Sequence, residues 1–148
     1  MTKKDNSAKI QDRDGNAWIY SDIVKDHFFN PRNILKKGEE DDFDYDGVGR
    51  VGSPACGDEM VIWIKVDNKT KKITDLRWQT FGCGSAIAST SVLSEMVLEG
   101  DGMTIDQAGQ ITAKQITERL GGLPPRKIHC SVLGDQALKK AIEDYQKK

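Results

Sequence analysis

The chain has 148 residues, of which 37% are hydrophobic and 30% are charged, and this length suits one globular domain. Its 22 Lys and Arg residues and 23 Asp and Glu residues give a formal net charge of −1, which excludes a general nucleic-acid binder with a strongly basic surface. The longest apolar run, residues 60–64, is too short to cross a bilayer, and no apolar segment of a secretory signal follows Met1. We therefore expect a cytoplasmic protein that binds neither nucleic acid nor membranes.

Two charged segments show no hydrophobic period. Residues 1–17 predict a flexible N-terminal tail, which leaves residues 18–148 as a single domain. Six of the residues in 36–47 are acidic, and a solvated loop is the preferred interpretation of this segment. The alternative, that the acidic loop 39–46 is a docking surface for a basic partner, stays open from the sequence.

A first helix is predicted to begin at Ser21, whose hydroxyl can accept from the free N–H groups of the first turn. Pro31 disfavours the helical conformation of the residue before it, so the helix should end at Asn30. Helical spacing places Val24 and His27 on one apolar face. His27 is therefore interpreted as a packed core residue.

Two strands are predicted in the middle of the chain. Residues 60–66 alternate as a strand with one core face requires, and residues 73–81 form a second strand after a polar turn. The pair is typical of an antiparallel hairpin, and a short strand at residues 48–51 can precede it.

Helices follow the strands. An apolar stripe after Ser85 predicts a helix that stops at Gly100, two short helices are expected within residues 104–120, and a long last helix spans about residues 127–146. This order predicts an α+β fold: a small antiparallel sheet of about three strands packed against helices, with a long C-terminal helix and a cysteine site at one exposed end.

The three cysteines lie at junctions between predicted elements. Cys56 precedes the first long strand, Cys83 lies between the second strand and a helix, and Cys130 follows His129 in the first turns of the last helix. An odd number of cysteines does not make a closed disulfide framework, and thiols are typical of a reducing cytosol. Because a helix N-terminus favours the thiolate, Cys83 and Cys130 suit metal binding or sulfur chemistry.

The spacing of these residues leaves the ligand set open. A lone cysteine is usually a small buried hydrophobe, but three at such junctions favour a common site. No Cys-x-x-Cys pair is present, so the pattern is not that of a zinc finger. Asp58 lies two positions after Cys56 and would point the same way in an extended segment. From spacing alone we predict a three-thiol site with Asp58 or His129 as a fourth ligand.

The chain resembles the IscU/NifU-type iron–sulfur cluster assembly scaffolds over roughly residues 20–145. Four segments carry the resemblance: residues 27–33 (HFFNPRN), 54–58 (PACGD), 80–89 (TFGCGSAIAS) and 123–131 (LPPRKIHCS). The second and third segments together are highly specific. The resemblance implies a transient [2Fe–2S] cluster that is built on the protein and passed to acceptor apoproteins, without enzymatic turnover.

The resemblance also implies roles for individual residues. Cys56, Cys83 and Cys130 are the cluster ligands, and Asp58 and His129 are alternative or supporting ligands. Lys127 is a polar neighbour that can exchange into the site. Cys130 is the preferred acceptor of persulfide sulfur, and Cys83 is the alternative.

The implied partners are a cysteine desulfurase, an iron donor, an electron donor and acceptor apoproteins. A DnaK-like chaperone reads a Leu-Pro-Pro-Val-Lys stretch in many relatives, which corresponds here to the stretch from Leu123 to Lys127. Arg126 replaces the apolar residue of that stretch, which counts against chaperone docking.

Three rival functions compete with the scaffold function. A zinc-dependent sulfur acceptor would hold zinc in the same site, and zinc can also occupy a true scaffold. A permanent iron–sulfur electron carrier would favour four thiolates. A hydrolase with a cysteine nucleophile is disfavoured, because adjacent residues such as His129 and Cys130 do not face together on a helix.

Overall fold

The computed structural model describes residues 9–11, 17–19, 21–36, 38–39, 42–53, 58–80, 84–122 and 128–147. Within these ranges, only the backbone is described at residues 9–11, 17–19, 53, 58, 84–85 and 128–133. The elements in chain order are β1 (Lys9–Gln11), β2 (Ala17–Ile19), α1 (Asp22–Phe29), β3 (Gly47–Ser53), β4 (Asp58–Val66), β5 (Ile73–Thr80), α2 (Gly84–Leu98), α3 (Ile105–Ala108), α4 (Ala113–Arg119) and α5 (Ile128–Lys147).

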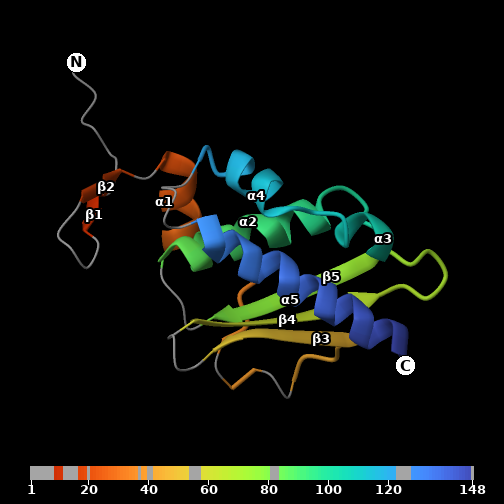
Figure 1. Cartoon of the computed structure of the whole chain (residues 1–148). Coiled ribbons are helices and arrows are strands. Elements are labelled where there is room, and N and C mark those ends of the chain that lie inside the picture. Colours follow the sequence, from red (N-terminus) through yellow and green to blue (C-terminus); the bar gives the residue numbers. More distant parts are fainter. Residues whose placement is uncertain are drawn as a thin grey trace.

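The predicted α+β fold is confirmed. Strands β3, β4 and β5 form an antiparallel sheet in that order, and α2 and α5 pack against one of its faces (Figure 1). The predicted short strand at residues 48–51 is β3, and it is longer than the sequence indicated. The two short helices expected within residues 104–120 are α3 and α4, each of which begins with a capping box.

The N-terminal segment contains regular structure that the sequence did not predict. Strands β1 and β2 pair antiparallel, with Ile10 opposite Trp18. The flexible tail predicted over residues 1–17 stays a prediction, and β1 lies within that segment. Ile10 and Trp18 are opposite each other in this register, and strands of three residues are too short to show an alternating pattern in the sequence. The boundary of the single domain at residue 18 stays a prediction.

Helix α1 begins as predicted. The hydroxyl of Ser21 accepts a hydrogen bond from the backbone N–H of Val24 at 3.2 Å, and the N–H of Asn30 closes the helix on the carbonyl of Asp26. His27 is 4% exposed, which confirms its assignment to the interior.

The sheet is buried on both faces along β4. Met60, Ile62 and Ile64 are fully buried on the helix side, as the alternation predicted. Val61 and Trp63 are also buried, because Leu35, together with the partly buried Phe43 and Val48, covers the other face. A strand with one solvated face is therefore the wrong description of β4.

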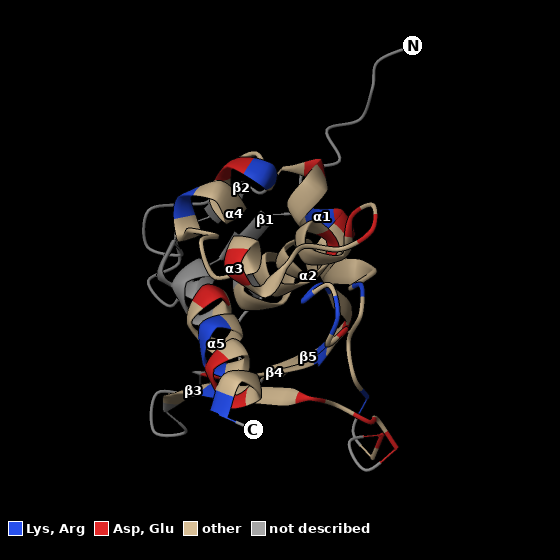
Figure 2. Cartoon of the chain, turned by 90° about the vertical axis from the view of Figure 1, so that its right-hand side faces the viewer, with Lys and Arg blue, Asp and Glu red and all other residues tan. Residues whose placement is uncertain are grey.

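The acidic segment before β3 is attached to the sheet. Phe43 lies against Lys65, whose ammonium nitrogen is 5.0 Å from the centre of the ring. A carboxylate oxygen of Asp46 accepts from the backbone N–H of Val66 at 2.8 Å. Figure 2 shows the acidic residues of this segment gathered at one corner of the molecule. Whether this loop 39–46 docks a partner stays open.

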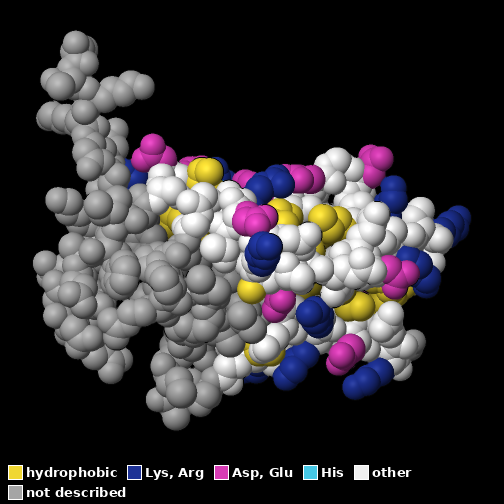
Figure 3. Space-filling model, turned by 45° about the horizontal axis from the view of Figure 1, so that its top comes forward, with side chains coloured by type: hydrophobic (Ala, Val, Ile, Leu, Met, Phe, Trp, Pro, Cys, Tyr) yellow, Lys and Arg dark blue, Asp and Glu magenta, His cyan; other side chains and the backbone are white. Residues whose placement is uncertain are grey.

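The face of the helices carries mixed charge. In Figure 3, Lys and Arg side chains alternate with Asp and Glu side chains over the part of that face that is described. That part of the surface therefore has no strongly basic patch of the kind that nucleic acids require. No helix among the described residues is long and apolar enough to span a membrane.

Candidate functional site

The structure describes the backbone of three of the predicted site residues. Asp58 is the first residue of β4, and His129 and Cys130 are the second and third residues of α5. The side chains of these three residues are not described. Cys56, Cys83 and Lys127 lie outside the described residues.

The connections that hold Cys56 and Cys83 start at the same edge of the sheet. Ser53, the last residue of β3, pairs with Asp58, the first residue of β4. The β4–β5 ladder has its final pair at the same edge, between Met60 and Thr80. The segment 54–57 therefore leaves and re-enters this edge, and the segment 81–83 leaves from it (Figure 1, left-hand end of the sheet).

Helix α2 begins at this edge as well. The backbone N–H of Ile73, at the start of β5, donates to the carbonyl of Met103, and the N–H of Met103 donates to the carbonyl of Val97, each at 2.8 Å. The end of α2 is thereby held beside the start of β5. Since β5 leads into α2, the two elements run antiparallel and the first turn of α2 lies near the end of β5.

Glycines in β3 set the direction of α5 over the sheet. A Cβ added to Gly47 would overlap the carbonyl oxygen of Ala141, and a Cβ added to Gly49 would overlap that of Ala137. The helix therefore contacts β3 in reverse order, at a spacing of about one helical turn for every two strand residues. It follows that α5 begins near the end of β3, so that His129 and Cys130 lie at the same edge as Asp58.

Thr90 lies where these elements meet. Its hydroxyl donates to the carbonyl of Ala86 at 2.7 Å and lies 3.4 Å from the sulfur of Met60. A Cβ added to Gly134 in α5 would be 3.6 Å from the hydroxyl oxygen of Thr90. Thr90 is fully buried, so α2, α5 and β4 are packed closely here. Sequence periodicity places Thr90 in the apolar stripe of the helix after Ser85, but it did not indicate that Thr90 lies between β4 and α5.

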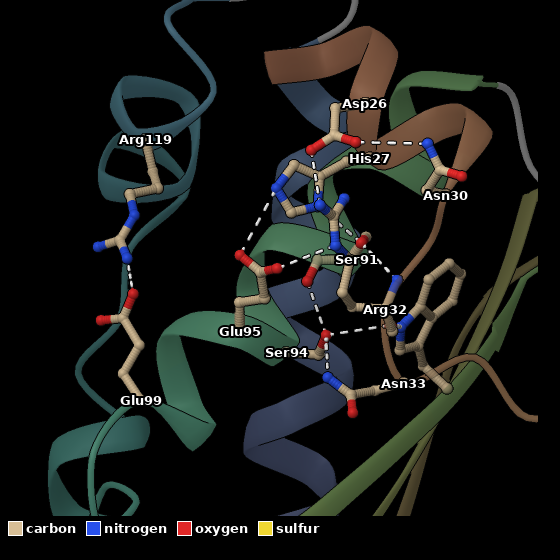
Figure 4. A network of polar contacts seen from close by, with 11 residues as sticks. Asp26, His27, Asn30, Arg32, Asn33, Ser91, Ser94, Glu95, Glu99 and Arg119 are labelled. Atoms are coloured by element: carbon tan, nitrogen blue, oxygen red, sulfur yellow. Dashed lines mark hydrogen bonds and ion pairs between the residues drawn. The ribbon is translucent and has the colours of Figure 1, made fainter.

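A buried polar network joins α1 to α2 (Figure 4). The Nδ1 atom of His27 is 2.7 Å from the hydroxyl oxygen of Ser91, which accepts from the backbone N–H of Arg32 at 2.9 Å. The Ser91 hydroxyl has one proton and two lone pairs, so it can pair with His27 Nδ1 as donor or as acceptor, depending on whether the neutral ring carries its proton at Nε2 or at Nδ1. That Nε2 atom faces the carboxylate of Glu95 at 3.7 Å. Burial lowers the pKa of His27 from its ordinary value of 6.5, and the nearby Glu95 carboxylate opposes this shift.

Arg32 links the same network to the sheet. Its guanidinium contacts the carboxylates of Asp26 at 2.6 Å and Glu95 at 3.0 Å. Its carbonyl accepts from the indole N–H of Trp78 at 2.7 Å. The next residue, Asn33, has a φ of 62°, a left-handed conformation that non-glycine residues rarely adopt. The segment 27–33, which carried part of the family resemblance, therefore holds α1 against α2 and β5.

Asp135 is a buried carboxylate near the start of α5. It is 7% exposed, and its Oδ1 atom has no hydrogen-bond partner within the described structure. Burial raises the pKa of Asp135 above its ordinary value, and Lys139 on the next turn lowers it less. The sequence gave no signal for this residue.

The described residues contain no group of three or more metal-ligating side chains. A cavity of about 650 Å³ lies at the opposite end of the molecule from the edge where α5 begins, lined among others by Lys71 and Tyr145. This cavity is therefore not at the edge of the sheet that β3 and β5 reach at Ser53 and Thr80.

Comparison with known families gives one match over most of the chain. The family model described as the NifU-like N terminal domain matches residues 19–148. The whole predicted tail, residues 1–17, which includes β1, precedes the matched region.

Curated relatives are about half identical to this chain. The iron–sulfur cluster assembly scaffold protein IscU 1 of Archaeoglobus fulgidus is 51% identical over 130 residues, which are 88% of this chain and 78% of that protein. The IscU scaffold of Haemophilus influenzae is 48% identical over 129 residues, which are 87% of this chain and 97% of that protein. The nitrogen fixation protein NifU of Azospirillum brasilense is 49% identical, and the match covers 40% of its length.

Solved structures support the fold. The N-terminal part of a NifU-like protein from Brucella abortus superposes with a TM-score of 0.63 at 18% identity, and the match covers 86% of this chain and 94% of that one.

Proposed function

The chain belongs to the family of NifU-like N-terminal domains, and we propose that it is a scaffold on which an iron–sulfur cluster is assembled and from which the cluster is transferred. One observation carries the proposal. The elements that flank all three cysteines begin or end at one edge of the sheet, although the cysteines are far apart in sequence. The names of the curated relatives favour this function over a zinc-dependent sulfur acceptor.

The proposed ligands are the thiolates of Cys56, Cys83 and Cys130. Thiolates are the usual ligands of iron–sulfur clusters, and Asp58 or His129 would complete the set with an oxygen or nitrogen donor. A set with three thiolates holds a cluster less tightly than one with four. This suits a protein that must release its cluster, and we propose a [2Fe–2S] cluster as the cargo.

Sulfur delivery is proposed to begin at Cys130. The Cys130 thiolate attacks the outer sulfur of a persulfide on a cysteine desulfurase. A new S–S bond forms, the old S–S bond breaks, and the desulfurase cysteine leaves as a thiolate. Two electrons from a separate donor then reduce the bound outer sulfur to sulfide and return Cys130 to a thiolate. Because the helix N-terminus favours the attacking thiolate, Cys130 is preferred over Cys56, with Cys83 as the alternative.

The proposed partners follow from this chemistry. A desulfurase supplies sulfur, an iron donor and an electron donor supply the remaining components, and acceptor apoproteins take the cluster. The chain then acts as a carrier and not as an enzyme with turnover. Chaperone docking at the stretch from Leu123 to Lys127, zinc binding in the same site and a cytoplasmic address stay predictions.

Anaerobic reconstitution with ferrous iron, cysteine and a desulfurase tests the proposal. We expect the parent chain to acquire the optical and Mössbauer spectra of a [2Fe–2S] cluster. Cys56→Ser, Cys83→Ser and Cys130→Ser should each fail to form a stable cluster. A parent chain that binds zinc tightly and forms no cluster under these conditions would contradict the scaffold function.

Persulfide mapping tests the order of delivery. Mass spectrometry after a reaction with the desulfurase, without iron, should find the extra sulfur mainly on Cys130. Sulfur found only on Cys56 would contradict the assignment.

A further inference from the structure

We propose that Thr80, acting through Glu59, is a positioning residue for cluster assembly; this inference rests on the proposed function. The hydroxyl of Thr80 donates a hydrogen bond to the backbone carbonyl of Glu59 at 2.8 Å. Thr80 is the last residue of β5 and Glu59 is the second residue of β4. The bond therefore joins the two strands at the edge from which two cysteine-bearing segments leave.

This bond extends the β4–β5 connection past the end of the ladder. The last paired position in the register is Met60 opposite Thr80, and Glu59 lies one residue beyond it. This side-chain hydrogen bond ties the second residue of β4 to β5 beyond the last ladder pair.

Glu59 also connects to β3 on its other side. It is opposite Gly52 in the β3–β4 register, and its carboxylate lies 3.0 Å from the guanidinium of Arg50. The Arg50 side chain is 69% exposed, so this ion pair contributes little in water. The hydrogen bond from Thr80 is partly buried and neutral, so salt does not screen it. Glu59 therefore connects β4 to both β3 and β5 at this edge. Of these two contacts, the hydrogen bond from Thr80 is less exposed to solvent than the ion pair with Arg50.

The consequence concerns the spacing of the two segments. Residues 54–57 are followed by Asp58 and then Glu59, and residues 81–83 follow Thr80 directly. When Glu59 and Thr80 are held together, the distance between the strand ends that carry the two segments is fixed. Cys56 and Cys83 must reach a shared iron from these strand ends. Metal sites tolerate misplacement of about 0.5 Å, so a supporting bond of this kind affects the metal more than the fold. Neither residue needs to touch the cluster.

Thr80→Val tests this inference, because valine keeps the branched shape and removes the donor. The matched control is Thr74→Val. Thr74 lies on the same strand, and its hydroxyl donates to a β4 carbonyl, that of Lys65, at 3.4 Å. This contact lies at the opposite end of the β4–β5 pair. Thr80→Ser, which keeps the hydroxyl and loses the methyl group, is the rescue variant.

Three quantities are measured for each variant: the half-life of the reconstituted cluster under anaerobic conditions, its visible circular dichroism, and the melting temperature of the metal-free protein. Thr80→Val should shorten the cluster half-life about fivefold, the factor that corresponds to one ordinary hydrogen bond. Its circular dichroism should also change. Thr74→Val and Thr80→Ser should match the parent in both.

A Thr80→Val cluster with the parent's half-life and spectrum would overturn the inference. Equal losses in Thr80→Val and Thr74→Val would also overturn it, because the effect would then belong to general sheet stability. If metal-free Thr80→Val does not fold, Thr80→Ser decides: a parent-like cluster supports the role of the hydroxyl and a short-lived cluster contradicts it. A parent chain that forms no cluster would refute the proposed function itself.

Discussion

His27 and Ser91 are in direct contact inside the protein, with 2.7 Å between the Nδ1 atom and the hydroxyl oxygen, although 64 residues separate them in sequence. The contact holds α1 on α2, and the Ser91 oxygen also accepts from the backbone N–H of Arg32. Protonating His27 would place a positive charge at this buried position, which burial disfavours.

The first prediction is a loss of stability as the pH falls. Burial lowers the pKa of His27 below 6.5 in the folded state, so the unfolded chain binds the proton more readily. The stabilisation from the neutral ring is complete above the unfolded value and is lost as the pH falls from 6.5 towards the lowered folded pKa. Urea unfolding of the metal-free protein between about pH 5 and pH 8 measures this.

The control for this prediction is His27→Gln, which removes the titrating ring. It should flatten the fall in unfolding free energy over that pH range. A fall as steep as the parent's would assign the effect to another group, such as His129.

The second prediction is that Asp135→Asn stabilises the protein at neutral pH. The raised pKa of Asp135 means that its protonated form suits the folded state; that benefit exists at low pH and is lost as the pH rises through the raised value. At neutral pH a buried charge with an unpartnered oxygen remains, and removing the charge should raise the unfolding free energy by about 1 kcal/mol.

Asp144→Asn is the matched control on the same helix. The Asp144 carboxylate accepts from the backbone N–H of Val48 at 2.9 Å, so neutralising it should bring no gain. The advantage of Asp135→Asn should shrink in acid, where Asp135 itself becomes neutral. An advantage that is independent of pH would contradict the explanation by charge.

The third prediction concerns the contact between β3 and α5. Gly49→Ala places a methyl group where the Ala137 carbonyl lies, so helix and strand must separate. Overpacking of this kind should cost about 2 kcal/mol of unfolding free energy. It should also increase amide exchange at the start of α5. Gly109→Ala is the control, because Gly109 has an ordinary helical φ of −66° and no such overlap. Equal stability of the two variants would contradict the close approach.

The fourth prediction concerns Asp58. If a carboxylate oxygen serves beside thiolates, it binds iron–sulfur clusters less well than sulfur and favours ligand exchange. Asp58→Ala should therefore still assemble a cluster, hold it longer and transfer it more slowly to an acceptor apoprotein. The exposed Asp101, changed to Ala, is the control for loss of one negative charge. Unchanged or faster transfer by Asp58→Ala would disprove this role, and loss of assembly would make Asp58 an obligatory ligand.

Most of the fold could be predicted from the sequence because its signals are local. Alternation along residues 60–66, the cap at Ser21 and the glycine at Gly100 each depend on neighbours within a few positions. Predictions were wrong where distant residues decide the environment. Trp63 is buried because Leu35 and Phe43 cover it.

For the candidate site as well, local features could be predicted from the sequence and contacts between distant residues could not. The residue types Cys56, Cys83, Cys130, Asp58 and His129 and their positions at junctions could be identified from the sequence, since junction signals and ligand chemistry are local properties. Their roles as ligands stay predictions. The contacts that support the site could not be identified, because Thr80, Glu59 and Thr90 are ordinary polar residues until strands and helices pack.

The sequence by itself determined the order of strands and helices, the presence of three thiols and the family resemblance. Only the tertiary structure decided that the flanks of these thiols share one edge of the sheet. That outcome depends on strand register, on the direction of α2 along β5 and on the close approach of α5 to Gly47 and Gly49. Each of these is a contact between residues far apart in the chain, and the free energy that selects it comes from packing the whole core, not from any local segment.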